Sequence, residues 1–253
     1  FNPEDLNALE QALTIKDMRE GSEVYILTMG PVRAADIIRD AMFRGADGGY
    51  LLTDRAFAGA DTLATSYALS RALKEIKPDI IVAGRQAIDG DTAQVGPQVA
   101  EKLGLPQVTY AEQIVRLTDK EIVIKRRLDN GVETVSSPYP MVMTVNGSAP
   151  ECRPMNAKRV MKYKHAKTRS ELQDAGEDYM VQLLEARGYL KITEWNVGDI
   201  DADPNQLGLL GSPTKVKQIE SVVFQAKESR RMSGSDEDIN SLMQELIASH
   251  TLG

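Results

Sequence analysis

The stretch Gly84-Arg85-Gln86-Ala87-Ile88-Asp89-Gly90-Asp91-Thr92-Ala93-Gln94-Val95-Gly96 joins two segments of very different pattern. It follows Asp79-Ile80-Ile81-Val82-Ala83, whose last four residues are apolar and mostly β-branched, which predicts a buried parallel strand. After it, Val95, Val99 and Leu103 recur at helical spacing, and Gly104 is typical of a helix end. A polar loop of small residues therefore connects the carboxyl end of a strand to a helix, which is where open α/β sheets bind nucleotides.

The two carboxylates of this loop, on Asp89 and Asp91, would repel a phosphate that they faced. Attraction must therefore come from main-chain N–H groups, around Gly90, Thr92, Ala93 and Gln94. The alternative is a tight loop without a ligand, in which Asp91 or Thr92 caps the helix. The loop matches neither the Rossmann G-x-G-x-x-G pattern nor the P-loop, so the pattern alone leaves both interpretations open.

Helical and strand patterns alternate on the amino-terminal side of this loop. We expect helices over 4–19 and 34–44, strands over 24–27 and 49–52, and a further helix that Asp61 caps. This alternation predicts an α/β fold with a doubly wound, mostly parallel sheet of the adenine-nucleotide-binding, Rossmann-like kind. Beyond Pro106 we expect an antiparallel region of strands at 107–117, 121–127 and 132–136, with a hairpin turn at Asp129-Asn130-Gly131 and a strand at 141–145 that returns to the main sheet.

The last third of the chain begins with a polar segment. We expect a polar helix over 171–187, an extended piece over 189–195 and irregular chain over 199–213. A final helix, capped by Ser235 or Asp236, has apolar residues at i, i+3, i+4, i+7 and i+8, namely Ile239, Leu242, Met243, Leu246 and Ile247. These patterns predict a nucleotide-binding domain over 1–190 and, over 191–253, an extended C-terminal arm whose helix packs on its own core or on a partner.

Composition excludes several classes of function. The chain has 253 residues and a formal net charge of −7, which argues against nucleic-acid binding, and no apolar run approaches the ~18 residues of a membrane span. The single cysteine, Cys152, and the two histidines, His165 and His250, offer no metal site, disulfide or catalytic triad, so we expect a cytoplasmic or organelle-matrix protein. The basic segment 153–169 is interpreted as a solvated connector, with an anion-binding patch as the alternative.

Several blocks of sequence, in one order, carry a family resemblance. The block 84–106 is joined by Asn2-Pro3-Glu4-Asp5, Thr28-Met29-Gly30-Pro31, Arg44-Gly45-Ala46-Asp47, the stretch 54–62 and Gly211-Ser212-Pro213-Thr214-Lys215-Val216. Together they resemble the electron transfer flavoprotein beta subunit over nearly the whole chain. By that resemblance, we expect the natural protein to have a strand and a loop, about 30 residues, before Phe1.

The resemblance also implies the residues of a nucleotide site. Carried over by position, the residues near the adenylate are Asn2, Pro3, Glu4, Asp5, Thr28, Met29, Gly30, Gly84, Arg85, Gln86, Ala87, Ile88, Asp89, Gly90, Asp91, Thr92, Ala93, Gln94 and Val95. Gly84 and Gly90 would permit close approach of the ligand, and Thr92 and Gln94 could donate to its oxygens. For Asn2-Pro3, a helix cap followed by proline is the simpler interpretation, and the two are compatible.

No nucleophile–base pair or carboxylate dyad stands out, so the chemistry is expected to belong to a cofactor rather than to catalytic residues of this chain. The resemblance implies a heterodimer with an alpha subunit that carries electrons between NADH or dehydrogenases and redox partners. Members hold either AMP or a second FAD, and we prefer FAD with NADH as donor and flavin-based electron bifurcation. The alternatives are a carrier with structural AMP only, and a nucleotide-binding regulatory domain without a redox role.

Three leucines among glycines form the last candidate site. Leu207, Leu209 and Leu210 are predicted to lie in a flexible loop that docks on a redox partner such as an acyl-CoA dehydrogenase. The alternative is that these leucines cover a local core.

Overall fold

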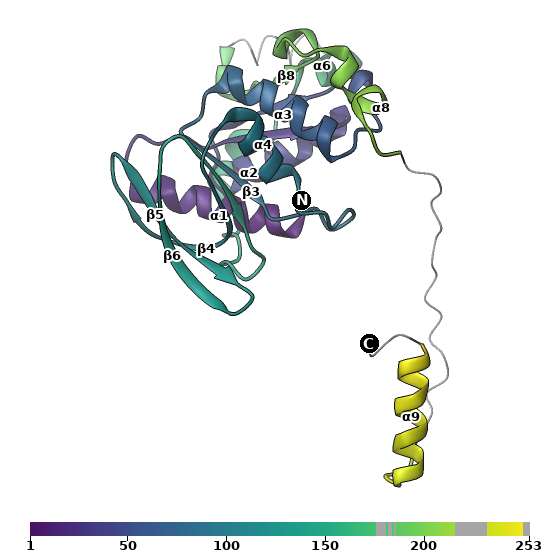
Figure 1. The fold of residues 1–253 in the computed structure, drawn as a ribbon. Coiled ribbons are helices and arrows are strands. Elements are labelled where there is room, and N and C mark those ends of the chain that lie inside the picture. The colour runs from purple at the N-terminus through teal and green to yellow at the C-terminus, as the bar shows by residue number, and fades with distance from the viewer. Residues whose placement is uncertain (176–180, 182–183, 185, 216–231, 250–253) are drawn as a thin grey trace. The chain divides into compact units, whose positions relative to one another are not determined.

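The computed structural model describes residues 1–175, 181, 184, 186–215 and 232–249. It divides into two units, Phe1–Lys215 and Val216–Gly253. The first unit contains both sheets and all the helices shown in Figure 1 except α9. The boundary lies later in the chain than the sequence patterns suggested, because residues 191–215 pack within the first unit.

The first unit has two sheets. The smaller is parallel, with strands in the order β1 (Tyr25–Met29), β2 (Gly48–Leu52) and β8 (Thr193–Trp195). The larger has the order β3 (Ile80–Gly84), β7 (Met141–Val145), β4 (Gln107–Leu117), β5 (Glu121–Leu128) and β6 (Gly131–Pro138). Strands β3, β7 and β4 are parallel, and β5 and β6 extend the sheet antiparallel through the expected hairpin. The mixed α/β class is thus confirmed, with the parallel strands divided between two hydrogen-bonded sheets.

Helices connect the parallel strands. They are α1 (Pro3–Met18), α2 (Ala35–Arg44), α3 (Thr62–Ile76) and α4 (Val95–Leu103), followed by α5 (Ala157–Tyr163), α6 (Arg169–Ala175) and the single turn α8 (Gly208–Gly211). Asp61 caps α3 by accepting hydrogen bonds from the N–H groups of Leu63 and Ala64, as the sequence predicted. Gly104 ends α4 in the left-handed conformation, again as predicted.

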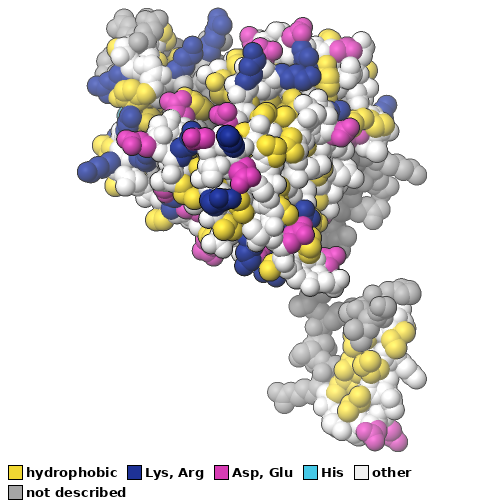
Figure 2. Space-filling model, turned by 60° about the vertical axis from the view of Figure 1, so that its left-hand side comes forward, with side chains coloured by type: hydrophobic (Ala, Val, Ile, Leu, Met, Phe, Trp, Pro, Cys, Tyr) yellow, Lys and Arg dark blue, Asp and Glu magenta, His cyan; other side chains and the backbone are white. Residues whose placement is uncertain are grey.

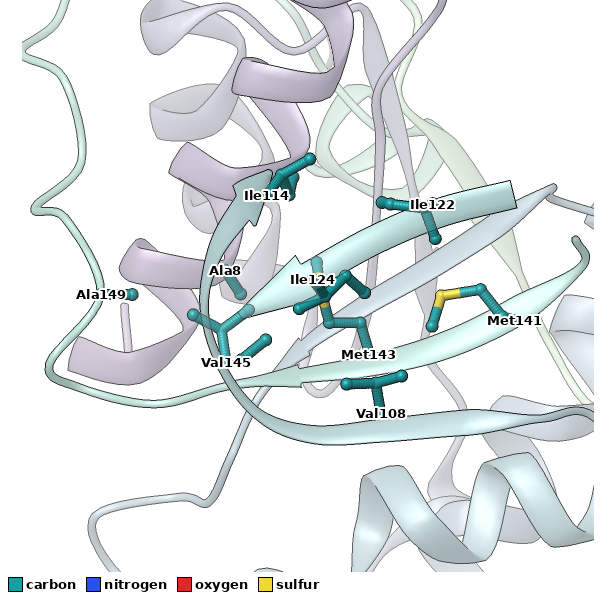
Figure 3. Packing of buried hydrophobic residues seen from close by; sticks show 10 residues of the cluster. Ala8, Val108, Ile114, Ile122, Ile124, Met141, Met143, Val145 and Ala149 are labelled. Carbon is teal, nitrogen blue, oxygen red and sulfur yellow. The ribbon is translucent and has the colours of Figure 1, made fainter. Parts of the chain in front are cut away.

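Helices cover both faces of the larger sheet. Met141, Met143 and Val145 of β7 pack in a cluster with Ala8 of α1, which Figure 3 shows together with the strands around it. Successive residues of a strand face opposite ways, so Thr144 faces the other side, where Gly96 of α4 packs against it. This two-sided covering explains why β7 is buried along its whole length.

Two segments, predicted to be irregular chain and a solvated connector, are packed instead. Residues 198–211 form two 3-10 turns, Gly198–Ile200 and Pro204–Gln206, followed by α8. Ile200 and Leu207 are buried beside α3. In the basic segment 153–169, Arg153 pairs with Glu10 of α1 and Tyr163 of α5 is buried, so this segment is part of the fold rather than a solvated connector.

The second unit contains helix α9 (Asp236–Ala248). Ser235 accepts a hydrogen bond from the N–H of Asp238 and so caps α9, which was one of the two expected caps. Its apolar residues Ile239, Leu242, Met243 and Ile247 are exposed in this unit. Figure 2 shows hydrophobic side chains along one face of this helix. No helix in the described part of the chain is long and apolar enough to cross a membrane.

Candidate functional site

The candidate site is the loop that leaves the carboxyl end of β3 and enters α4. It lies where the sequence predicted, between Gly84, the last residue of β3, and Val95, the first of α4. Strand β3 runs parallel to β7, with Gly84 opposite Val145, and the N–H of Arg85 donates to the carbonyl of Val145. The loop therefore starts from a fixed edge of the sheet.

The first part of the loop, residues 84–88, is held by the N-terminus of α1. The side chain of Asn2 donates to the carbonyl of Gln86 over 2.9 Å and accepts from the N–H of Ile88 over 3.1 Å. The carboxylate of Asp5 accepts from the N–H of Gly84 over 2.8 Å. The side chains of Asn2 and Asp5, which were expected to contact the adenylate, thus position the loop. We call residues 84–88 the inner half of the loop.

Glu4 completes this fastening. Its carboxylate accepts from the N–H of Gln86 over 2.9 Å and pairs with the guanidinium of Arg85 over 3.0 Å. The hydrogen bond with Glu4 is the largest reason that the pKa of Arg85 is raised. Burial is the largest reason that the pKa of Asp5 is raised above its ordinary value.

Gly84 is required by the packing of α1 against the loop. A Cβ at this position would lie 2.6 Å from the Asp5 carboxylate and 2.8 Å from the Asp5 backbone nitrogen. The sequence predicted that a small residue at position 84 lets the nucleotide come close. In this structure, the element that comes close to Gly84 is α1. A Cβ on Gly90, by contrast, would meet no atom of the described residues within 4 Å, so the surroundings of Gly90 are open.

The second part of the loop, residues 89–94, is open, and we call it the outer half. Asp89, Gly90, Asp91, Thr92 and Gln94 are exposed. Asp91 and Ala93 have positive φ angles of 46° and 52°, and Thr92 between them does not. A backbone that alternates between left-handed and right-handed conformations makes successive N–H groups converge. The N–H groups of residues 92–94 donate a hydrogen bond to no acceptor within the described residues.

The start of α4 does not match the alternative interpretation, in which Asp91 or Thr92 caps this helix. Gln94 occupies the N-cap position, and its side chain makes no cap hydrogen bond. Asp91 instead accepts from the Gln86 side chain over 2.7 Å, and Gln94 accepts from the hydroxyl of Thr62 over 2.9 Å. The N-cap side chain therefore does not cap the first N–H groups of α4. These groups face the outer half, where they add the positive end of the helix dipole.

The charges of the loop explain what it could bind. Arg85 is the loop's one basic residue, and Glu4 already neutralises it, while Asp89 and Asp91 are exposed acids. An anion held here must therefore rely on main-chain N–H groups, as expected from the sequence. No group of His, Cys, Asp and Glu side chains within the described residues could hold a metal ion.

The remaining predicted positions belong to other elements of the fold. Thr28 and Met29 end β1 in the smaller sheet, and no hydrogen bond among the described residues joins them or Gly30 to the loop. Leu207 is 2% exposed and belongs to the core, whereas Leu209 and Leu210 are 59% and 78% exposed on α8. Only the last two of these three leucines are available to a partner.

Two residues next to the loop were missed from the sequence. Tyr110 of β4 lies against Arg85, and Thr144 of β7 lies between Tyr110 and α4. Thr144 is the single hydroxyl residue in the otherwise apolar run 141–145, which is a signal that could have been noticed. Tyr110 carries no such signal, because an aromatic residue is ordinary in a strand.

Comparison with known proteins identifies the family. The family model described as the electron transfer flavoprotein domain matches residues 1–168, about two thirds of the chain. The chain belongs to the electron transfer flavoprotein family. A protein named electron transfer flavoprotein subunit beta from Clostridium acetobutylicum is 39% identical over 248 residues, which cover 98% of this chain and 83% of that protein.

Two further relatives of this electron transfer flavoprotein chain carry other names. Caffeyl-CoA reductase-Etf complex subunit CarD from Acetobacterium woodii is 42% identical over 217 residues, 85% of this chain and 73% of that protein. Protein FixA from Rhizobium meliloti is 38% identical over 256 residues, 98% of this chain and 79% of that protein. The predicted resemblance to the electron transfer flavoprotein beta subunit is thus confirmed.

Proposed function

We propose that this chain is the beta subunit of a heterodimeric electron transfer flavoprotein and binds the adenylate part of FAD at the outer half of the loop. The observation that carries the proposal is the set of N–H groups at residues 92–94 that have no partner among the described residues, at the carboxyl end of a strand, in a chain of a flavoprotein family. These donors fit a phosphate, and because the loop has no free basic side chain, the binding is left to the backbone. AMP at the same place is the alternative ligand.

The residues of the chain would bind and orient the cofactor, whose isoalloxazine supplies the redox chemistry. Glu4, Asn2 and Asp5 keep the inner half in place, so the N–H groups of the outer half need no reorganisation when a phosphate arrives. NADH as donor, electron bifurcation and an acyl-CoA dehydrogenase as a redox partner are part of this proposal. The CarD relative, named as a subunit of a caffeyl-CoA reductase-Etf complex, supports a redox partner that acts on a CoA ester.

The nucleotide content of the purified heterodimer tests the cofactor. We expect two FAD molecules per heterodimer by visible absorption and by chromatography of the denatured protein. One FAD with one AMP would support the carrier with structural AMP. A complex that contains an adenine nucleotide and no flavin would overturn the redox role and favour the regulatory alternative.

We propose that α9 packs on the alpha subunit. Its apolar face is exposed within its own unit, and such a face is stable in water mainly when it is buried against another surface. Leu242→Asp should reduce recovery of the heterodimer on co-expression, whereas Gln244→Asp, a matched change at an exposed polar position, should not. Equal recovery of both variants would contradict this partner role.

We propose that the partner dehydrogenase docks on Leu209 and Leu210 of α8. Both are exposed, and the nearby hollow of about 360 Å³, lined by Leu63, Tyr67 and Leu210 among others, adds shape to this surface. Replacing each by alanine should slow electron transfer to the dehydrogenase and leave flavin content unchanged. Leu207→Ala is the control for a structural effect, since Leu207 is in the core. If the variants at 209 and 210 lose flavin in parallel with the rate of electron transfer, these leucines are structural too.

We also propose a cytoplasmic location. NADH is an intracellular reductant, so a complex that oxidises it is expected in the cytoplasm. Cell fractionation against a cytoplasmic marker enzyme tests this, and recovery with a secreted marker would contradict it.

A further inference from the structure

Tyr110 has a backbone conformation that is rare for an aromatic residue. Its φ angle is 58°, in the left-handed region that glycine and asparagine adopt readily and bulky residues avoid. The pairing of β4 with β7 shifts between Val108 and Ala111, which places Tyr110 in a bulge. Figure 3 shows β4 turning sharply between Val108 and Ile114. The chain thus keeps a tyrosine where the backbone favours a smaller residue.

Tyr110 is not a core residue, because 38% of it is exposed. A strained residue that contributes little to the core is more often explained by a site than by stability. The question is therefore what the ring lies beside.

The backbone of Tyr110 is fastened to the start of α4 through a single residue. Its N–H donates to the hydroxyl of Thr144 over 3.3 Å. The methyl group of the same Thr144 packs against Gly96, so closely that a Cβ on Gly96 would lie 2.4 Å from it. Tyr110 is thus one side chain away from the first turn of α4, which the outer half of the loop enters.

The ring of Tyr110 also contacts the inner half of the loop. The guanidinium carbon of Arg85 lies 5.6 Å from the ring centroid, within the range of a cation–π contact. Glu4 also pairs with this guanidinium. The guanidinium and the phenol ring are therefore neighbours beside the loop, and both are partly exposed.

We propose that Tyr110 and Arg85 form a stacking platform for a planar heteroaromatic ring of the nucleotide whose phosphate binds at the outer half. This inference rests on the proposed function and adds residue 110 to the site. The ring is that of adenine or of the isoalloxazine, which share this chemistry, and the experiment below separates them. Tyr110 is a binding residue in this account, and Thr144 positions it.

The test uses the full-length heterodimer, stripped of nucleotide and titrated separately with AMP and with FAD. Tyr110→Asn suits the left-handed backbone and removes the ring, so its unfolding midpoint without nucleotide should equal or exceed that of the wild type. Its dissociation constant should rise about tenfold, as expected for loss of one stacking contact. Tyr110→Phe should restore binding, and Tyr189→Asn, which changes an exposed tyrosine outside the site, should have no effect.

The ligands separate the two rings. Weaker binding of both AMP and FAD places adenine on the platform, and weaker binding of FAD alone places the isoalloxazine there, with less quenching of flavin fluorescence. Dissociation constants within twofold of the wild type for both ligands would overturn the proposal. If Tyr110→Asn does not fold, Tyr110→Leu against Tyr110→Phe gives the same comparison. A wild-type heterodimer that binds neither ligand at this loop would remove the proposed function itself.

Discussion

The two halves of the 84–94 loop are adjacent in sequence and opposite in construction. In the inner half, side chains of Asn2, Glu4 and Asp5 bond the backbone at 84, 86 and 88. In the outer half, the N–H groups of residues 92–94 have no partner among the described residues, and Gly90 is surrounded by open space. The chain thus fixes one half with its own groups and leaves the other available to a ligand.

This contrast separates two uses of small residues in one motif. Gly84 is small because α1 approaches it, and a change there should affect folding. Gly90 is small although no described neighbour in the chain requires it, and a change there should affect the ligand. Substitutions in the two halves are therefore expected to act on different measurements.

The largest effect is expected from Gly84→Val. Its side chain would meet the backbone of residues 4 and 5, which cannot move as a flexible side chain could, so we expect the free energy of unfolding to fall by about 3 kcal/mol. Denaturant unfolding without nucleotide measures it. A variant as stable as the wild type would show that the inner half is not fixed by α1.

Gly90→Val is the matched change in the outer half. We expect stability without nucleotide to be unchanged, because the new side chain meets nothing within 4 Å among the described residues. Nucleotide affinity should fall at least about tenfold, or ~1.4 kcal/mol, by steric exclusion. Nucleotide retained after gel filtration, together with the titrated dissociation constant, measures this; full occupancy would mean that the outer half is not the site.

Glu4→Gln weakens the fastening without removing the side chain. Glutamine can still accept from the N–H of Gln86 but no longer pairs with Arg85 as an ion, so we expect a loss of about 1 kcal/mol in unfolding free energy. Glu101→Gln, at an exposed position of α4, is the control and should change nothing. Equal stability of the two variants would argue against a role of the ion pair in holding the inner half.

The smallest effect concerns pH. Because burial raises the pKa of Asp5, the folded state binds this proton more readily than the unfolded state, whose value is 3.8. The contribution of Asp5 to stability is therefore complete below pH 3.8 and is lost as the pH rises through the folded pKa. Asp5→Asn removes this contribution, so the stability of the variant relative to the wild type should increase as the pH rises from 3.8 through the raised pKa of Asp5 in the folded protein. The free energy of unfolding in urea, measured at several pH values, tests this. The same pH dependence for the variant and the wild type would contradict the prediction.

Much of the fold follows from local patterns. The run 80–83 became the parallel strand β3, Asp61 capped α3, and Gly104 ended α4, because each depends on residues close in sequence. The prediction that this strand is buried was wrong: β3 is only partly buried, since it lies at an edge of the larger sheet. The division into two sheets depends on long-range pairing, such as β2 with β8, which no local period encodes. Residues 199–213 were interpreted as irregular because their turns are short, yet burial of Ile200 and Leu207 beside α3 holds the turns in place.

The position of the loop was predictable, but its contacts were not. The strand–loop–helix pattern located the loop, and its acidic residues led to the prediction that an anion bound there would be held by main-chain N–H groups. The roles of Asn2, Glu4 and Asp5 could not be foreseen, because they bond residues about 80 positions away. The bulge that exposes Tyr110 depends on the register of β4 against both neighbours, which the sequence does not state.

Amide hydrogen exchange of the heterodimer, with and without its nucleotide, tests the central claim most directly. We predict that nucleotide protects the amides of residues 92–94 strongly. Those of Gly84, Gln86 and Ile88, which already donate within the chain, should change little. Unchanged exchange at residues 92–94, with protection appearing elsewhere in the chain, would contradict it.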